Sequence, residues 1–174
     1  MRVSSGDGSV PVVSESEKPA PTHLTGPVVE QSATLPLSPS AVWTLLTTAE
    51  GLSTWYAIGG GAEVEAEPGG AIALWWEQGK VFRGTVGICR APERFDYRIP
   101  QSPDEKLDPE TTTLVQFKID PVEGQPDQAV ITVRESGFTQ LERPKDAFTA
   151  SSIAWIGAFG LLQQVADRLA TMTE

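Results

Sequence analysis

Two spacings of hydrophobic residues divide the sequence into helical and strand regions. The first helical region carries one apolar stripe at positions i, i+3, i+4 and i+7, formed by Val42, Leu45, Leu46 and Ala49. Ser38 followed by Pro39 is typical of a helix start, because serine caps the free amides and proline tolerates the first turn. Gly51 is typical of a helix end. The pattern predicts a helix from Ser38 to Gly51, with a second short helical turn over residues 52–55.

A longer helix is predicted at the C-terminal end, over residues 146–172. Its apolar residues recur at helical spacing and are Trp155, Phe159, Leu162, Ala166 and Leu169. Gly157 and Gly160 interrupt it, although each glycine destabilises a helix by about 1 kcal/mol relative to alanine. Glycine at these positions permits close approach of the backbone or a bend, and one candidate reason is that this helix presses against a strongly curved sheet.

Between residues 59 and 138 the hydrophobic spacing changes to two, which indicates strands. The segments are AEVEAEPGG, AIALWWE, KVFRGTVGICR, ERFDYRI, TTTLVQFKID and QAVITVRESGF, and VVEQSATLPL supplies an earlier strand. Short links between consecutive strands favour an antiparallel meander. The sequence therefore predicts an α+β fold. A curved antiparallel sheet of six to seven strands wraps around the long C-terminal helix, and two short helices follow strand 1.

Composition adds a boundary between a tail and one domain. Residues 1–27 are rich in serine, glycine, proline and glutamate, which bury too little apolar surface to offset the entropy of ordering. We predict a flexible tail over 1–27 and a single domain over 28–174. A length of 174 residues suits one domain.

The charge and the cysteine content exclude several classes of protein. A net charge of −10 with no cluster of basic residues argues against nucleic acid and against an anionic membrane surface. No run approaches the roughly 20 apolar residues of a membrane span, and the N-terminus lacks the apolar core of a signal peptide. Cys89 is the single cysteine, so no internal disulfide forms. We predict a cytoplasmic protein.

An ordered set of motifs resembles one family. These motifs are LPLSPSAVWTLLTTAEGLSTWY (35–56), PGGAIAL (68–74), APERF (91–95), VRESGF (133–138) and IAWIGAFGLLQQVADRLA (153–170). Together they resemble the activator of heat-shock-protein-90 ATPase homologue family, within the START-related helix-grip (SRPBCC) superfamily. The resemblance covers residues 28–172 and implies a helix-grip fold. A sheet gripping a helix commonly encloses a cavity that suits a small apolar ligand.

Catalytic and metal-binding sets are not evident in the predicted domain. His23, the only histidine, lies in the tail, so no serine or cysteine triad is predicted. One histidine and one cysteine supply too few ligands for zinc, and residues 59–61 lack the pattern of a nucleotide-binding loop. We predict no catalytic residues, no metal and no cofactor.

Glu135 is the one acidic residue that shares the alternation of an inward-facing row of residues, after Ala129, Ile131 and Val133. Buried there, it needs a partner such as Arg83 or Arg98, or a raised pKa. A salt bridge at the strand end is the favoured interpretation. The alternatives are a polar contact for a ligand or a general base, in which role Tyr97 is also a candidate.

Adjacent Trp75 and Trp76 point to opposite faces of their strand, so one of them lies on the outer face. By parity Trp76 faces inward with Ile72 and Leu74, while Trp75 faces outward. The outward tryptophan is either covered by the tail or contacts a partner, for example a second copy in a homodimer.

Three functions follow from these patterns. The first is non-enzymatic binding of a hydrophobic or amphipathic small molecule between the sheet and the last helix. The predicted lining is Trp43, Trp55, Tyr56, Leu74, Trp76, Phe82, Phe117, Glu135, Trp155 and Phe159. The second is a chaperone contact or another protein interaction, implied by the resemblance. The third is an enzyme resembling the polyketide cyclases of the same superfamily.

Overall fold

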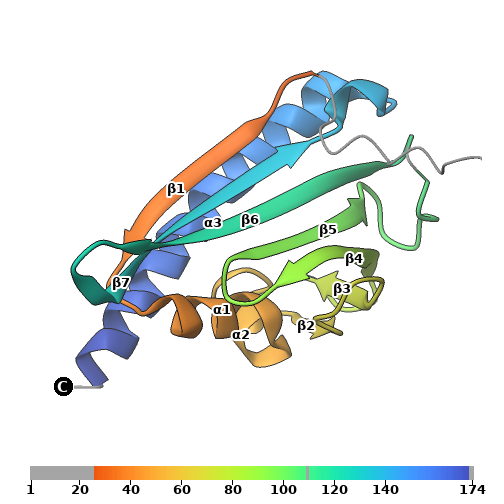
Figure 1. Cartoon of the computed structure of the whole chain (residues 1–174). Helices are drawn as coiled ribbons and strands as arrows, with labels where there is room; N and C mark the ends of the chain where they lie inside the picture. The colour runs from red at the N-terminus through yellow and green to blue at the C-terminus, as the bar shows by residue number, and fades with distance from the viewer. Residues whose placement is uncertain (1–25, 109, 173–174) are drawn as a thin grey trace, which may run out of the picture.

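The computed structural model describes residues 26–108 and 110–172 of the chain (Figure 1). The predicted tail lies outside the described residues except for Gly26 and Pro27, and so does His23. The chain begins with β1 (Val29–Leu35), α1 (Pro39–Thr47) and α2 (Ala49–Trp55). The strands β2 (Gly61–Val64), β3 (Ala71–Trp75), β4 (Phe82–Arg90), β5 (Arg94–Pro100), β6 (Thr112–Val122) and β7 (Gln125–Ser136) follow. A 3₁₀ turn, η1 (Phe138–Gln140), leads into α3 (Pro144–Met172).

All seven strands form one antiparallel sheet in the order β1-β7-β6-β5-β4-β3-β2. Consecutive strands pair from β2 to β7, as the short links predicted, and β1 closes the far side by pairing with β7. Helix α3 runs along the inner face behind β1, β7 and β6, and α1 and α2 lie at one end (Figure 1). The predicted α+β architecture is confirmed.

The boundary between the two short helices differs from the prediction. Gly51 does not end the first helix: it lies buried inside α2, while Thr48 breaks the chain in extended geometry between α1 and α2. The Thr48 side chain caps α2 by accepting a hydrogen bond from the amide of Gly51 at 3.0 Å. A Cβ at Gly51 would lie 2.6 Å from the Thr44 carbonyl oxygen. Glycine is therefore required here for close helix packing and not for a helix stop.

The core lies between the inner face of the sheet and α3. The row predicted to face inward on β7 is buried (Ala129, Ile131, Val133 and Glu135), and the same alternation buries Val115, Phe117 and Ile119 on β6. In the row predicted inward with Trp76, Ile72 and Leu74 are buried, whereas Trp76 is 38% exposed. From α3, the buried side includes Trp155, Ala158, Phe159, Leu162, Val165 and Ala166. The inward residues of the strands and the buried residues of α3 thus pack together in one contiguous apolar cluster.

Two glycines of α3 make no contact with the described residues that would require glycine. A Cβ built at Gly157 or Gly160 meets nothing within 4 Å in the described part of the chain. The interpretation that they press against the sheet is therefore wrong, because both residues are exposed on the opposite side of the helix. No helix in the described ranges combines the length and the apolarity that a membrane crossing needs.

Candidate functional site

The candidate site is a polar cluster inside the apolar core. On the inner face, Tyr97 of β5 pairs with Val115 of β6, which pairs with Glu135 of β7. Residues opposite one another on neighbouring strands point to the same face, so Tyr97 and Glu135 stand in one row, one strand apart. Alternation along each strand therefore places a hydroxyl and a carboxyl group under α3.

Glu135 is held by neutral donors and not by a salt bridge. Thr113 donates its hydroxyl to Oε1 at 2.6 Å, and the indole N–H of Trp155 donates to Oε2 at 2.7 Å. The expected partners do not reach it: Arg83 is exposed, and Arg98 neighbours Tyr97 on β5 and so faces the other way. The interpretation as a strand-end salt bridge is therefore wrong.

Burial shapes the titration of this carboxyl group. Glu135 is 4% exposed, and desolvation raises its pKa above the ordinary value. Hydrogen bonds from Thr113, Trp155 and Ser151 oppose that shift by stabilising the carboxylate. The net direction is upward, so the interior favours the protonated acid more than water does.

Two tyrosine hydroxyls complete the cluster. The hydroxyl of Tyr97 is fully buried and makes no hydrogen bond of good geometry within the described residues. Burial raises the pKa of Tyr97, and the neighbouring Tyr56 and Glu135 raise it further. Burial of its hydroxyl, followed by the charge of Glu135, also raises the pKa of Tyr56. Both phenols therefore stay neutral and keep their protons for hydrogen bonding.

An aromatic series connects this cluster with the surface. Tyr56, at the end of α2, stacks on Trp155 with ring centroids 4.9 Å apart and an interplanar angle of 7°. Trp76 meets Tyr56 edge-on at 5.2 Å, and its indole N–H donates to the Tyr56 carbonyl oxygen at 2.6 Å. Phe82 packs against Trp76 at 5.6 Å. Since Trp76 is 38% exposed, the series begins at the surface and ends at the indole that binds Glu135.

The residues predicted to line the site fall into two groups. Trp55, Leu74, Phe117, Trp155 and Phe159 are buried in the core, whereas Trp43, Tyr56 and Phe82 are partly buried and Trp76 lies at the rim. Trp43 lies apart from the aromatic series and packs on Phe95, with the ring centroids 6.1 Å apart.

The outward tryptophan, Trp75, is partly buried. Its ring lies over Gly60 and Gly61 of the neighbouring segment, where a Cβ would collide with the indole. The predicted outer position is thus covered by the domain itself.

Thr113 and Ser151 are the partners of Glu135 that the sequence interpretation missed. Thr113 shares the parity of Val115, Phe117 and Ile119, so extending that inward row by one step would have found it. Threonine is common on the outer faces of strands, and this made the signal weak.

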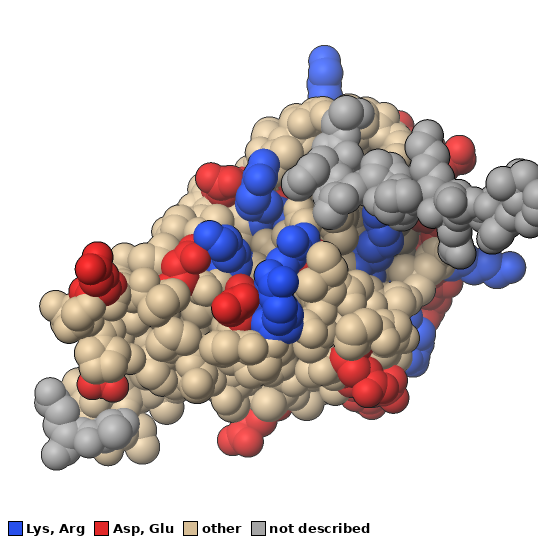
Figure 2. All heavy atoms as spheres, viewed as in Figure 1, with Lys and Arg blue, Asp and Glu red and all other residues tan. Residues whose placement is uncertain are grey.

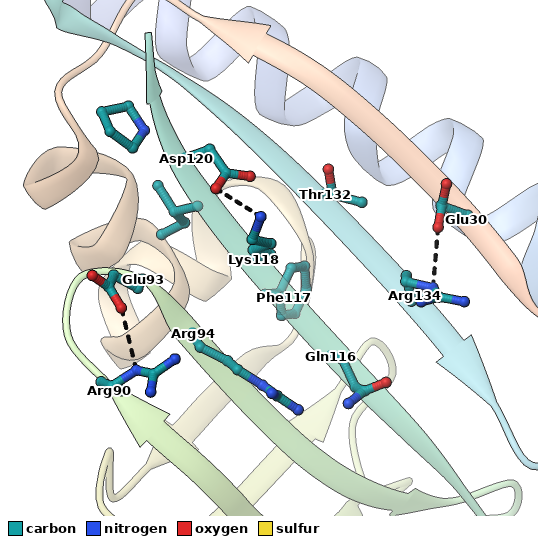
Figure 3. A pocket seen from close by; sticks show the side chains of 12 residues that line it. Glu30, Arg90, Glu93, Arg94, Gln116, Phe117, Lys118, Asp120, Thr132 and Arg134 are labelled. Carbon is teal, nitrogen blue, oxygen red and sulfur yellow. Dashed lines mark ion pairs between the residues drawn. The ribbon is translucent and has the colours of Figure 1, made fainter. Parts of the chain in front are cut away.

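A second hollow lies on the outer face of the sheet and has a different chemistry. It is a groove of about 630 Å³ across β1, β7, β6 and β5 (Figure 3). Basic and acidic side chains lie next to one another on this face (Figure 2). Arg134 pairs with Glu30 at 3.0 Å, Lys118 with Asp120 at 2.8 Å, and Arg90 with Glu93 at 3.2 Å. Because these cations already have acidic partners, the groove offers little attraction to an anionic ligand.

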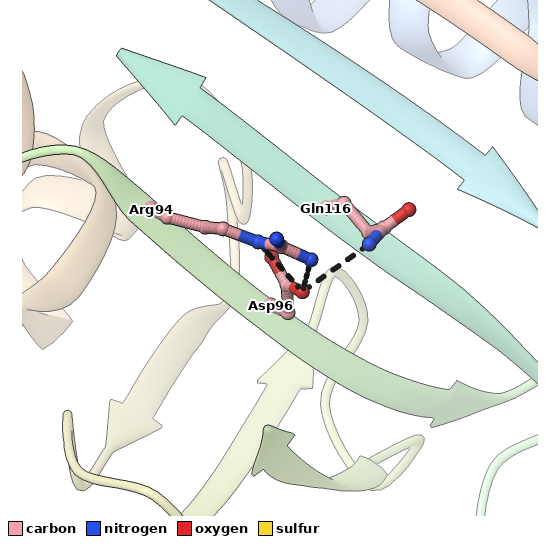
Figure 4. A network of polar contacts seen from close by, with 3 residues as sticks. All are labelled: Arg94, Asp96 and Gln116. Atoms are coloured by element: carbon pink, nitrogen blue, oxygen red, sulfur yellow. Dashed lines mark hydrogen bonds and ion pairs between the residues drawn. The ribbon is translucent and has the colours of Figure 1, made fainter. Parts of the chain in front are cut away.

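Asp96 anchors the remaining cation of that groove. Arg94 donates to both carboxylate oxygens of Asp96, at 2.7 to 3.2 Å, and the Gln116 amide donates at 3.3 Å (Figure 4). Asp96 is 3% exposed although it lies on the outer face, because these neighbours cover it. The Asp96 hydrogen bond raises the pKa of Arg94, which stays charged. The arrangement ties β5 to β6 and leaves no unpaired charge for catalysis.

The curved sheet around a long C-terminal helix, with a polar cluster between them, defines the helix-grip class of proteins. A family model described as Activator of Hsp90 ATPase homolog 1-like protein matches residues 36–172. The chain therefore belongs to this family, as the motifs predicted. No curated protein matches the chain significantly.

Solved structures show the same fold at low sequence identity. Protein MLL2253 from Mesorhizobium loti is 18% identical, with a TM-score of 0.67 over 82% of this chain and 98% of its own. The Aha1 dimer from Colwellia psychrerythraea is 15% identical, with a TM-score of 0.65 over 81% and 96%. An HSP90 activator from Plasmodium falciparum is 17% identical, with a TM-score of 0.52 over 64% and 74%.

Proposed function

We propose that the chain binds a small hydrophobic or amphipathic molecule between the sheet and α3. The observation that carries this proposal is the buried Tyr97 hydroxyl, which makes no hydrogen bond of good geometry in the described residues, although the Tyr56 hydroxyl lies near it. A buried polar group without a partner is destabilising and uncommon in native proteins. A ligand that hydrogen-bonds to the Tyr97 hydroxyl would supply a partner with better geometry. The aromatic series would cover the rest of such a ligand.

The chemistry of the cluster narrows the class of ligand. Glu135 lies close enough to raise the pKa of Tyr97, so an anionic group placed there would meet a second acid in a poorly solvated interior. A neutral hydroxyl or carbonyl group fits better. We therefore expect neutral polyphenol-like molecules to bind more tightly than fatty acids with a free carboxylate.

Entry of the ligand is proposed at the rim. Trp76 and Tyr56 close the outer end of the aromatic series, and Trp76 is held by one hydrogen bond to the Tyr56 carbonyl. Since Trp76 is already 38% exposed, rotating its side chain outward disturbs little of the core. This motion would open a path to Tyr97 without displacing the sheet.

Tryptophan fluorescence tests this function. The full chain is titrated with naringenin as the neutral polyphenol, with decanoate and with anilinonaphthalene sulfonate. We expect naringenin to quench the emission, because Trp155 and Trp76 flank the proposed site. Tyr97→Phe should weaken binding of naringenin about tenfold, the equivalent of one hydrogen bond.

The same titration contains its own control. Ser32→Ala removes a hydroxyl from the exposed outer face and should leave the affinity unchanged. An unchanged spectrum with all three probes would contradict the proposal, and so would equal affinities for Tyr97→Phe and the unaltered chain.

A chaperone contact is the second candidate, favoured by the match to the family of Hsp90 activator homologues and by the fold of the Plasmodium protein. Capture of purified 90-kDa heat-shock chaperone by the immobilised chain would support it. Unaltered chaperone ATPase activity together with failed capture would reject it. Homodimer formation likewise stays a proposal, for which the dimer of the Colwellia relative is a precedent.

A further inference from the structure

The outer side of α3 carries a strip of exposed residues that the fold does not use. The strip is centred on Gly157. At 3.6 residues per turn, its members lie within about 60° of Gly157 around the helix axis. We name it the outer strip; it consists of Asp146, Ala150, Ile153, Ala154, Gly157, Gly160, Leu161, Gln164 and Arg168, all exposed.

The middle of the outer strip is apolar and unusually exposed. Ile153 is 67% exposed and Leu161 is 38% exposed, and Ile156 beside the strip is 60% exposed. Large apolar side chains in one exposed patch are typical of an interaction surface.

Gly157 and Gly160 give the second indication. Each destabilises a helix relative to alanine, and neither meets any described atom that a Cβ would disturb. The described residues of the single chain therefore give no reason for glycine at these positions. A second helix crossing at Gly157 would give that reason, since glycine permits close approach of two backbones.

The charges at the two ends of the outer strip identify the second helix. Asp146 lies eleven residues before Gly157, and Arg168 lies eleven residues after it. In an antiparallel pair related by a twofold axis at Gly157, Asp146 of each chain faces Arg168 of the other. The same symmetry sets Ile153 opposite Leu161, and Ala154 opposite Gly160. A surface that is complementary to itself about one axis is the requirement for a twofold homodimer.

We propose that two copies of this chain associate through the outer strip, with their α3 helices antiparallel and crossing at Gly157. This interface lies on the far side of α3 from Trp155 and the polar cluster, and it does not depend on the proposed ligand function. A contact formed mainly by one helix from each chain is small beside the roughly 1,200–2,000 Å² of stable interfaces. We therefore expect a dimer that dissociates on dilution.

Sedimentation velocity of the full chain over a range of concentrations tests the proposal. We expect the average mass to rise from monomer to dimer with concentration. Gly157→Leu should abolish the dimer, because its side chain prevents the close crossing. The variant should still fold, since a Cβ at Gly157 meets no atom of the described residues within 4 Å, and its circular dichroism and melting temperature will show this.

Charge reversal distinguishes a second copy from another partner. Asp146→Lys and Arg168→Glu should each weaken the dimer about tenfold, because each places like charges together at both ends. The double variant Asp146→Lys with Arg168→Glu should restore dimer formation, since the pairing is then reversed but complementary. Lys145→Glu, about 120° around the helix from the outer strip, is the control of equal charge change and should have little effect.

Two results would overturn the proposal. One is a chain that stays monomeric at every concentration. The other is a dimer that Gly157→Leu leaves intact, because that dimer would use another surface.

Discussion

Single residues decide the chemistry of the interior. Glu135 and Tyr97 lie in one row of the sheet, yet their environments differ: Glu135 has donors from Thr113 and Trp155, whereas the Tyr97 hydroxyl has no well-formed hydrogen bond in the described residues. Removing a satisfied group and removing an unsatisfied one should have different consequences. A substitution that removes the Tyr97 hydroxyl should therefore weaken ligand binding without lowering the stability of the ligand-free chain.

Tyr97→Phe should leave the stability of the ligand-free chain unchanged or raise it by about 1 kcal/mol, because it removes a buried hydroxyl that lacks a good partner. Urea unfolding of both chains without ligand measures the difference. A loss of more than about 2 kcal/mol would show that the hydroxyl already has a strong partner inside the protein.

Glu135→Gln should change how stability depends on pH. Folding raises the pKa of Glu135. At pH values above the ordinary pKa of glutamate, the folded chain therefore holds more protons at this residue than the unfolded chain does. Stability from this group is therefore full at low pH and falls as pH rises from about 4 through the raised pKa. Glutamine does not titrate, and its side chain keeps an oxygen to accept from Trp155.

The measurement is the melting temperature of both chains from pH 4 to pH 8. The melting temperature of Glu135→Gln minus that of the unaltered chain should increase with pH. A difference that increases toward low pH would show that hydrogen bonding stabilises the carboxylate more than burial destabilises it.

At the scale of elements, glycine has opposite meanings in two helices. Gly51 in α2 lies against the backbone of α1, where a Cβ would meet the Leu45 Cα at 2.7 Å. A Cβ at Gly157 in α3 would meet no described atom within 4 Å. The sequence shows both as glycines in or near a helical pattern, so only the neighbours distinguish them.

The same substitution should therefore have opposite effects at these two positions. Gly157→Ala should stabilise the chain by about 1 kcal/mol through helix propensity. Gly51→Ala should destabilise it by about 1–3 kcal/mol, because the packed helices must move apart. Chemical denaturation at low protein concentration, where the chain is monomeric, measures both. Destabilisation by Gly157→Ala would mean that an undetected contact covers that face.

At the scale of the whole molecule, the tryptophans divide between core and rim. Trp55 is fully buried and donates its indole N–H to the Leu45 carbonyl at 3.0 Å, which ties α2 to α1. Trp76 is 38% exposed and closes the rim. The region first predicted as one aromatic lining thus contains a structural anchor and a candidate entrance.

Trp55→Ala should destabilise the chain by about 3–5 kcal/mol, and Leu46→Ala by about 2–5 kcal/mol, because both leave cavities in the buried core. Trp76→Ala should cost less than about 2 kcal/mol, since much of its side chain is already exposed. Urea unfolding followed by circular dichroism compares the three. A loss at Trp76 as large as that at Trp55 would contradict a mobile rim.

The fold could be predicted from the sequence because local patterns carry it. The period-two rows around Val115 and Ile131 specify one apolar face of the sheet, and the helical stripe through Phe159 specifies one apolar face of the helix. Both faces are buried only if the sheet covers the helix. The position of Glu135 on the inner face follows from the same alternation. The family motifs point to the same architecture.

Contacts between distant segments had to come from the tertiary structure. Two donors to Glu135, Thr113 and Trp155, lie 22 and 20 residues away along the chain. The helical spacing placed Gly157 in α3, but only the packing of α3 showed which side faces the sheet. The sequence thus determined where the helices and strands run and which strand residues share a face, because alternation and helical period are local. The tertiary structure decided which polar groups find partners and which surfaces stay uncovered, because those depend on how separate elements meet in space.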